Sequence, residues 1–327
     1  MNMHTNFNDA QQAQFGFVVN QAYAINAQVY ATKFPDLDFG RLVYVDTSAP
    51  EWTPGIITFL SSSVGKAGWY SGAAKDVPRA DVTMDKSEVR VHMAAIGYGY
   101  NDEEIGQAQL LGMNLGTAKA EAARRAYMEF MWNITLTGDT TKNLLGLANQ
   151  SAVTAGTAPA DGTGSVTTWF DANGNATKTP QQIVRDINSV LTGIFTGSLT
   201  VEMADTLLLP YSTISYLGAT PMSSTNSETI LSFILRTNIY TQMTGQQITI
   251  RGVLGLDTAG ASSTKRMVAY ANRQDVVKLH LPMPHRFGHS GGLVYQDGPS
   301  SFQIPGRFRT GGVEVLRTGA FRYLDGI

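Results

Sequence analysis

Residues 134–150 read ITLTGDTTKNLLGLANQ, and this stretch decides how the chain is divided. A helical pattern precedes it, Gly138 interrupts that pattern, and an apolar patch returns as Gly-Leu-Ala-Asn at residues 146–149. None of its side chains forms a catalytic pattern. A short turn in the middle of a long chain typically connects two large structural parts. Its role therefore depends on the residues on each side.

The composition excludes several classes of protein. With no cysteine, the 327-residue chain forms no disulfide, has no thiolate catalysis and binds no metal through cysteine. Its net charge of -2 argues against tight, sequence-specific binding of nucleic acid, which needs clustered basic residues. The sequence has neither a secretion-signal pattern nor a long uncharged apolar run, so we expect no membrane-spanning helix. The charged fraction of 15% is low, which indicates that much of the surface is covered.

The first 50 residues are predicted to form an N-terminal arm. Apolar positions at helical spacing predict an amphipathic helix within residues 9–31, with Asn8 or Asp9 as its cap. Pro35 and Pro50 interrupt the segment that follows, which we interpret as an extended connection.

Residues 51–100 are predicted to form one long β-hairpin. Strands are expected at residues 56–60 and 81–100, and the Gly-, Ser- and Ala-rich tip between them is far longer than an ordinary hairpin loop. A two-stranded ribbon is at best marginally stable alone in water, so we expect this one to lie against another surface, which can belong to another chain. Five residues are candidates for contacts between subunits: Trp52, Lys66, Trp69, Tyr70 and Lys75. The exposed aromatic rings are typical of interface anchors, whereas the lysines also fit ordinary solvated charges.

Residues 101–180 contain a predicted helix, the 134–150 turn and a polar excursion. The spacing of Asn101 and Glu104 is that of a capping box, and no proline occurs before Gly138, so we expect a single long helix. Residues 151–178 are small and polar, and we interpret them as an exposed excursion without a core of their own.

The remaining residues are predicted to form an α+β fold. A helix is expected from Thr179, with Pro180 at its first position and Gln182 completing a capping box. A mixed α/β domain over residues 181–285 continues with strands and helices, and residues 286–327 are expected to form strands joined by a Gly-Gly turn. The expected elements are a strand at 204–210, helices near 210–218 and 226–237, and strands at 247–253 and 266–272.

Catalytic and metal-binding motifs are missing or incomplete. His280, His285 and His289 could be imagined as a metal cluster, but two prolines break their spacing and polar turns are the preferred interpretation. Residues 63–68, SVGKAG, lack the first Gly and the final hydroxyl of a phosphate-binding loop. Residues 171–178, DANGNATK, lack the Gly and the later Glu of a calcium loop. We therefore expect no catalytic residue, no cofactor and no metal.

The order of these parts resembles that of tailed-bacteriophage major capsid proteins, which have the Hong-Kong-97-type coat fold that encapsulins share. The resemblance implies that the long helix is a spine, that the ribbon laps a neighbouring subunit, that residues 181–285 are an axial domain and that residues 286–327 return to the peripheral domain, 101–180. A separate scaffolding protein is also implied. The matching residues are Gly138, Asp139, Gly146, Leu147 and Asn149 in the turn, the LLLP run at 207–210, and Gly326 with Ile327.

The resemblance implies a structural function and not an enzyme. Many copies would form an icosahedral virion shell, assembled in the host cytoplasm, around packaged double-stranded DNA. The implied partners are other copies in pentamers and hexamers, scaffolding and portal proteins, an optional decoration protein, and DNA through weak non-specific contacts, with no membrane. The alternatives are an encapsulin-type compartment, a cytosolic enzyme that uses the three histidines, and a tail or adhesin component, for which the sequence lacks fibre or β-sandwich signals.

Overall fold

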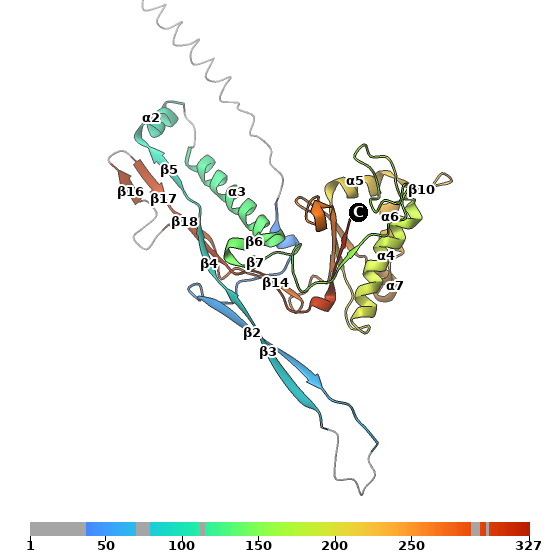
Figure 1. Ribbon diagram of the computed structural model, residues 1–327. Coiled ribbons are helices and arrows are strands. Elements are labelled where there is room, and N and C mark those ends of the chain that lie inside the picture. The colour runs from blue at the N-terminus through green and yellow to red at the C-terminus, as the bar shows by residue number, and fades with distance from the viewer. Residues whose placement is uncertain (1–36, 70–78, 112–114, 289–294, 299–300) are drawn as a thin grey trace, which may run out of the picture. The chain divides into compact units, whose positions relative to one another are not determined.

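The computed structural model describes residues 37–69, 79–111, 115–288, 295–298 and 301–327 (Figure 1). The helix expected within residues 9–31 lies outside these residues. The chain divides into two compact units, of which unit 1 includes residues 95–127 and 287–306 and unit 2 includes residues 38–94, 128–286 and 307–327.

Unit 1 contains a three-stranded sheet and helical segments. The sheet has the order β16 (Tyr295–Gly298), β17 (Ser301–Ile304), β5 (Tyr98–Asn101), and β17 pairs antiparallel with both neighbours. The helices are α2 (Asp102–Leu111) and α3 (Leu115–Leu136), which continues into unit 2. The expected capping contact is confirmed, because the backbone N–H of Asn101 donates to Glu104 at 3.2 Å. Residues 112–114 between the helices are not described, so the single long helix stays a prediction.

Unit 2 is built around a five-stranded sheet with the order β12-β9-β13-β20-β8. Its strands confirm the predictions at 204–210, 247–253 and 266–272, and β20, from the predicted C-terminal segment, also lies in this sheet. The two ends of the sheet are parallel pairs, β12 with β9 and β20 with β8, whereas the inner pairs are antiparallel. The strands are β8 (Ala155–Thr157), β9 (Thr206–Pro210), β12 (Thr249–Val253), β13 (Arg266–Tyr270) and β20 (Phe321–Asp325).

The core of unit 2 lies between this sheet and the helices drawn beside it in Figure 1. Helix α4 (Pro180–Gly197) begins with the predicted capping box, in which Thr179 accepts from the backbone of Gln182 and the Gln182 side chain accepts from the backbone of Thr179. One face of α4 is buried through Ile183, Ile187, Val190, Leu191 and Ile194, and β9 is buried along its whole length. The other helices of this unit are α5 (Tyr211–Ala219), α6 (Ile230–Arg236) and α7 (Ile239–Thr244).

Three predictions need correction. Residues 151–178 are not simply an exposed excursion, because Trp169 and Lys178 are buried and Trp169 belongs to the main core. The helix expected near 226–237 starts at Ile230, because residues 226–229 form β11 and pair with β10 (Pro221–Ser223). The strand expected over residues 81–100 is divided into β3 (Asp81–Arg90), β4 (His92–Ala95) and β5.

The 134–150 turn folds back against the end of α3. Gly138 has a φ of 71°, and a Cβ on Gly146 would lie 2.4 Å from the carbonyl oxygen of Leu136, so both positions require glycine. Asn149 closes the turn, because its side chain accepts from the N–H of Gly146 at 2.7 Å and donates to the carbonyl of Thr137 at 2.6 Å. The motif GD…GL.N therefore encodes a compact reversal of the backbone.

The remaining elements are short. The Gly-Gly turn at residues 311–312 joins two strands as predicted, but they enter different sheets, because β18 lies in the order β15-β18-β4 and β19 in the order β1-β14-β19. The elements are η1 (Phe39–Arg41), β1 (Val45–Asp46), β6 (Gly138–Asp139), η2 (Thr140–Lys142), β7 (Leu144–Leu145), η3 (Ala261–Ser263), β14 (Val277–His280), β15 (Met283–Phe287), β18 (Gly306–Thr310), β19 (Gly312–Val315) and η4 (Thr318–Ala320).

Candidate interface at the ribbon

The predicted ribbon is confirmed as a two-stranded antiparallel sheet in unit 2. Strands β2 (Gly55–Val64) and β3 pair in one unbroken register, from Gly55 opposite Arg90 to Val64 opposite Asp81. Among the described residues, no third strand joins this pair. At about 3.3 Å per residue, each ten-residue strand reaches about 33 Å.

The two faces of the ribbon differ in exposure. Side chains alternate between the faces of a strand, and residues directly opposite each other share a face. On one face near the root, the side chains are half-buried at Ile56, Thr58, Leu60, Ser87 and Val89. The other face, which we call the outer face, carries four exposed apolar residues: Ile57 (53% exposed), Phe59 (72%), Val82 (59%) and Met84 (75%). This row has the composition of a contact surface, and within its own chain it remains open to solvent.

A buried polar chain holds the root of the ribbon. The hydroxyl of Thr58 donates to Glu314 Oε2 at 3.1 Å, and His280 Nε2 lies 2.8 Å from the same oxygen. The imidazole Nδ1 of His280 lies 4.0 Å from Asp46 Oδ2. Burial raises the pKa of Glu314, but the hydrogen bonds from His280 and Thr58 outweigh it and leave the pKa below its ordinary value. Glu314 is therefore a carboxylate at neutral pH and joins the ribbon to strands β14 and β19.

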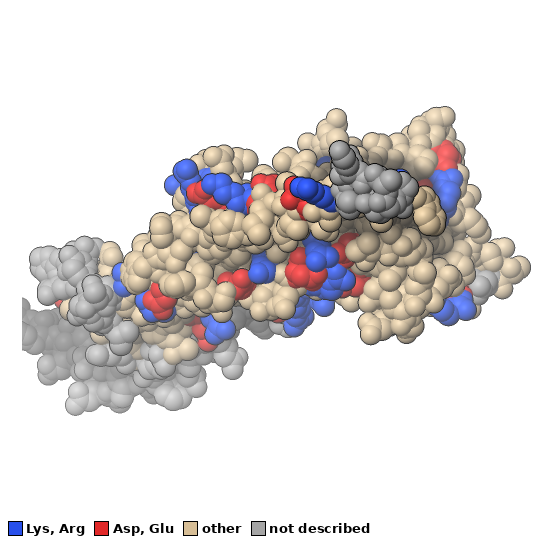
Figure 2. Space-filling view, turned by 90° about the horizontal axis from the view of Figure 1, so that it is seen from below, with Lys and Arg blue, Asp and Glu red and all other residues tan. Residues whose placement is uncertain are grey.

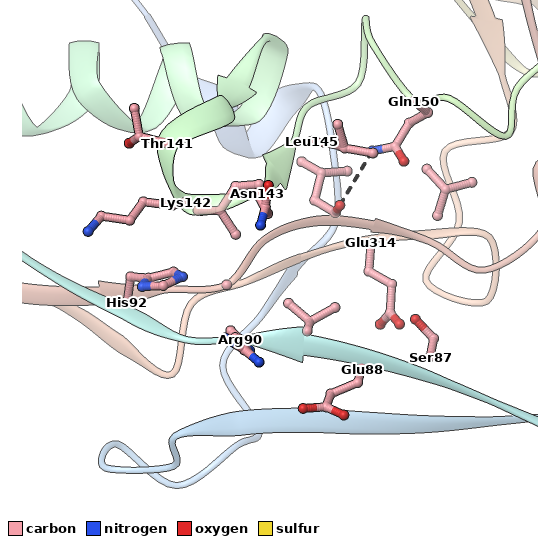
Figure 3. Close-up of a pocket in the computed structure, with 15 residues that line it drawn as sticks. Ser87, Glu88, Arg90, His92, Thr141, Lys142, Asn143, Leu145, Gln150 and Glu314 are labelled. Carbon is pink, nitrogen blue, oxygen red and sulfur yellow. Dashed lines mark hydrogen bonds between the residues drawn. The ribbon is translucent and has the colours of Figure 1, made fainter.

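A pocket of about 680 Å³ lies beside this root (Figure 3). Its walls come from the end of β3, from the 134–150 turn and from β19. Close approach here depends on Gly311, because a Cβ at that position would lie 2.9 Å from the side chain of Val89. The labelled polar side chains include Glu88 and Arg90 from β3 and Lys142 from the 134–150 turn. The pocket is thus lined by charged side chains where three segments meet. Separately, the described residues contain no group of three side chains able to hold a metal.

Trp52 lies just before β2, beside one ion pair and a hydrogen bond to the backbone of Glu51. The indole is 60% exposed, and the guanidinium of Arg309 lies over its ring at 5.8 Å from the centroid. Arg286 makes a two-pronged contact with the neighbouring Glu51, at 2.9 and 2.8 Å, and Arg309 donates to the carbonyl of Glu51 at 2.7 Å. An exposed tryptophan on a rigid base fits the properties of an interface anchor.

Two other candidate residues lie at the opposite end of the ribbon. Lys66 and Trp69 follow β2, and both are exposed, Trp69 completely so. Tyr70 and Lys75 lie outside the described residues. The structure thus places Trp52 at the root and Lys66 and Trp69 beyond the far end of β2, so these residues do not form one cluster.

Sequence reasoning missed the outer face and the position of His280. The alternation of Ile57 with Phe59 and of Val82 with Met84 was a visible signal, but only the contact with β19 decides which face is open. His280 lies buried in strand β14 and not in a polar turn, whereas His285 lies in β15 and His289 is outside the described residues.

Comparisons with known proteins agree with this architecture. The family model described as major capsid protein matches residues 65–327, which is most of the chain. No curated protein matches the sequence. Within the described part of the chain, every helix is too short or too polar to span a lipid bilayer.

Solved capsid structures share the fold of this chain at low sequence identity. The capsid of Myoviridae phage XM1 is similar with a TM-score of 0.74 and 17% identity, over 92% of this chain and 95% of that chain. The capsid of a native GTA particle gives a TM-score of 0.58 and 10% identity, over 91% and 93% of the two chains. The structure from Mycobacterium phage Ogopogo has a TM-score of 0.56 and 10% identity, over 91% of this chain and 94% of that chain. These matches confirm the predicted capsid fold and give no support to the encapsulin alternative.

Proposed function

The chain belongs to the major capsid protein family, and from this premise we infer that many copies of it assemble into the shell of a tailed-bacteriophage virion. The shell would be icosahedral and would enclose packaged double-stranded DNA. We propose that the function is structural and that the chain acts by assembling with its copies, without catalysing a reaction.

One observation carries this proposal: the outer face of the ribbon leaves four apolar side chains open to solvent, beside the charged Lys86 and Glu88. Ile57 and Phe59 on β2 and Val82 and Met84 on β3 share this face, and the buried polar chain through Glu314 fixes the ribbon at its root. Burying these side chains against another copy removes apolar surface from water, at about 25 cal/mol per Å². Because each copy both gives a ribbon and receives one, modest contacts add over a closed shell.

Copies of the chain are the principal partners, arranged in pentamers and hexamers. Trp52, Lys66, Trp69, Tyr70 and Lys75 are proposed to contact neighbouring subunits, with Trp52 acting at the root and the others beyond β2. The predicted arm, residues 1–50, and the peripheral and axial domains, 101–180 and 181–285, are proposed to take the roles that the family resemblance implies. Scaffolding and portal proteins, and a decoration protein on the outside, are proposed as further partners.

Contact with packaged DNA is proposed to be weak and non-specific. The net charge is -2, and on the face shown in Figure 2 basic and acidic side chains lie beside each other without a patch of one sign. Tight binding of duplex DNA needs clustered positive charge. The purified chain should therefore bind duplex DNA weakly and lose that binding as salt rises, and nanomolar affinity at physiological salt would contradict this part of the proposal.

The assembly function is tested by expressing the full chain, alone and with the phage's scaffolding protein. Sedimentation velocity and negative-stain electron microscopy should show uniform round shells or tubes. The variant Phe59→Ser should reduce their yield, while Ser63→Ala, on the same face of the same strand, should leave it unchanged. A folded monomer at every concentration, with and without scaffold, would refute the proposal.

A further inference from the structure

A lysine and two aspartates form a buried ionic cluster at the start of helix α4. Lys178 Nζ lies 2.7 Å from Asp186 Oδ2 and 3.2 Å from Asp161 Oδ1. The side chains of Lys178 and Asp186 are fully buried, whereas that of Asp161 is 31% exposed. Removing ionised groups from water is costly, and apolar side chains of similar volume are often at least as stable in such a position. The stability of the core alone therefore does not account for this cluster.

The geometry of the cluster brings an amine close to a carboxyl carbon. Because a C–O bond is about 1.2 Å long, a nitrogen 2.7 Å from Asp186 Oδ2 lies within about 4 Å of the Asp186 Cγ. Reactions between bound groups start from separations of about 3–3.5 Å, so a small movement of the side chains gives a reactive contact. Neither group has to come from solution, because the fold already holds both.

Fixed donors surround the Asp186 carboxylate. The guanidinium of Arg185 donates to Oδ1 at 2.7 Å, and the indole N–H of Trp169 donates to Oδ2 at 3.2 Å. Trp169 is itself completely buried, so its N–H has no access to solvent. When a nucleophile adds to a carboxyl carbon, negative charge develops on one oxygen, and a positioned donor stabilises it. Arg185 is placed to do this at Oδ1, while Oδ2 is the oxygen nearest the lysine.

The loss of water changes what the buried pair can do. In water an ammonium ion and a carboxylate stay solvated and do not condense. In a site closed to water that solvation is lost, and passing one proton from Lys178 to Asp186 removes both charges at once. Partial desolvation raises the pKa of Asp161, but hydrogen bonds from Arg185 and Lys178 outweigh it and leave the pKa below its ordinary value. Asp161 is therefore a carboxylate at neutral pH and can act as a base beside the amine.

We propose that the side chains of Lys178 and Asp186 join in an amide bond within the folded chain. Nζ attacks the Asp186 Cγ, the Nζ–Cγ bond forms and the Cγ–Oδ2 bond breaks. Oδ2 leaves as water with two of the three protons of the ammonium group, and Asp161 relays one of them. No oxidant, reductant or activating group takes part. One positive and one negative charge disappear together, and Arg185 keeps its ion pair with Asp161, at 2.6 Å.

The bond fastens the segment before α4 to the body of the helix. Lys178 directly precedes the capping residue Thr179, and Asp186 lies inside α4. Helix ends normally open first, because their backbone groups have the fewest partners. A covalent link across the first turns of α4 holds this end closed and slows the unfolding of the chain. The inference concerns a single chain and goes beyond its assembly.

Intact-mass spectrometry of the purified full chain tests for the bond. The natural chain, kept at neutral pH, should weigh less than its sequence mass by one water molecule. Lys178→Arg keeps a cation at this position but removes the amine, so it should have its full sequence mass. Asp186→Asn should give the same amide with loss of ammonia in place of water. Asp161→Asn should slow the loss of water by about a hundredfold, because the base is missing.

Peptide mapping locates the bond. Trypsin cleaves after lysine and arginine, but not after a lysine whose amine is part of an amide. An unlinked chain gives separate peptides 143–178, 179–185 and 186–236. The linked chain should give peptides 143–185 and 186–236 joined as one branched product. The natural chain supplies this result by itself, so the test holds even where a variant does not fold.

Two results would overturn the inference. The natural chain could show its full sequence mass after prolonged incubation, with peptides 143–178 and 179–185 cleaved apart, and the cluster would then be ionic only. Alternatively, Lys178→Arg could lose water as well, which would place the reaction at another site, such as a cyclic imide at Asp161 and Gly162. Neither result bears on the proposed function, and failure of the natural chain to assemble would leave the mass result unchanged.

Discussion

The five-stranded sheet and the ribbon are made from similar residues and end in opposite environments. Strand β9 is buried at every position, because helices and neighbouring strands of the same chain cover it. Strand β2 is twice as long as β9 and pairs in an unbroken register, yet Ile57 and Phe59 are exposed to solvent. The sheet completes its contacts within the chain and the ribbon does not. Changes in the sheet should therefore alter the stability of one chain, whereas changes on the outer face should alter only the association of copies.

The largest loss of chain stability is expected from Lys178→Met. Removal of the Lys178 ammonium group leaves the buried Asp186 carboxylate with one cation fewer. This should lower the free energy of unfolding by about 3 kcal/mol. Urea denaturation of the unassembled chain measures this loss. The matched variant Lys66→Met, at an exposed lysine in the ribbon segment, should change the unfolding free energy by less than about 0.5 kcal/mol. Equal denaturation midpoints for the two variants would contradict the contrast between core and ribbon.

The 134–150 turn follows helix α3. Substitutions in this turn should cause the second largest loss in the free energy of unfolding. Gly146→Ala places a Cβ 2.4 Å from the Leu136 backbone, which should destabilise the chain by about 1–3 kcal/mol. The control Gly106→Ala lies in α2 with nothing within 4 Å of the new Cβ, so it should raise helix stability by up to about 1 kcal/mol. Thermal unfolding measures both, and a stable Gly146→Ala chain would show that the turn tolerates a side chain.

The root of the ribbon, where Thr58 is bonded to Glu314, should respond to acid. Because the pKa of Glu314 is lowered in the folded chain, its contribution is fully present above its ordinary value of 4.5 and is lost as the pH falls through the lower folded value. In Glu314→Gln, hydrogen-exchange protection at the ribbon root, residues 87–90, should fall about tenfold at neutral pH.

A comparison of protection factors across pH isolates this effect. Below pH 4.5 the natural chain should approach the Glu314→Gln variant in protection at the root, while protection in β9 remains higher in both. Identical protection of the root in the two chains at neutral pH would mean that Glu314 does not hold the ribbon.

The smallest effect on chain stability is expected from the outer face itself. Phe59→Ser should change the unfolding free energy of the unassembled chain by less than about 0.5 kcal/mol, because the ring is already in solvent. Chemical denaturation checks this value on the same preparation used for assembly. A loss comparable with that of Lys178→Met would show that the ring is covered within its own chain.

Elements specified by neighbouring residues could be predicted from the sequence. The capping box at Thr179 and Gln182 and the start of α4 depend on side chains a few residues apart, and the two strands of the ribbon depend on alternation along each strand. The buried position of Lys178 could not be predicted, because its carboxylate partners, Asp161 and Asp186, lie on separate segments that only the fold brings together. A lysine in a polar, glycine-rich stretch ordinarily indicates an exposed loop.

The candidate interface was predictable in outline and not in detail. The length of the ribbon tip and the exposed aromatic residues indicated a contact between chains. The direction of the outer face depends on Gly311 and Glu314, more than 200 residues away, which cover the opposite face near the root. Trp52 stays a proposed contact, and its rigid base depends on Arg286 and Arg309, whose approach no local pattern signals.

In the part of the chain that the structure describes, the ribbon has two strands and two free edges, and each edge carries backbone N–H and C=O groups that another strand could pair with. In a cell that makes many copies at once, such edges are templates for mispairing and precipitation before the chains reach their places. Charged side chains recur along β3 at Asp81, Asp85, Lys86, Glu88 and Arg90, and charges on an edge strand oppose that pairing. Strand β3 thus combines the exposed Val82 and Met84 with charges that disfavour pairing of its free edge with a strand of another chain.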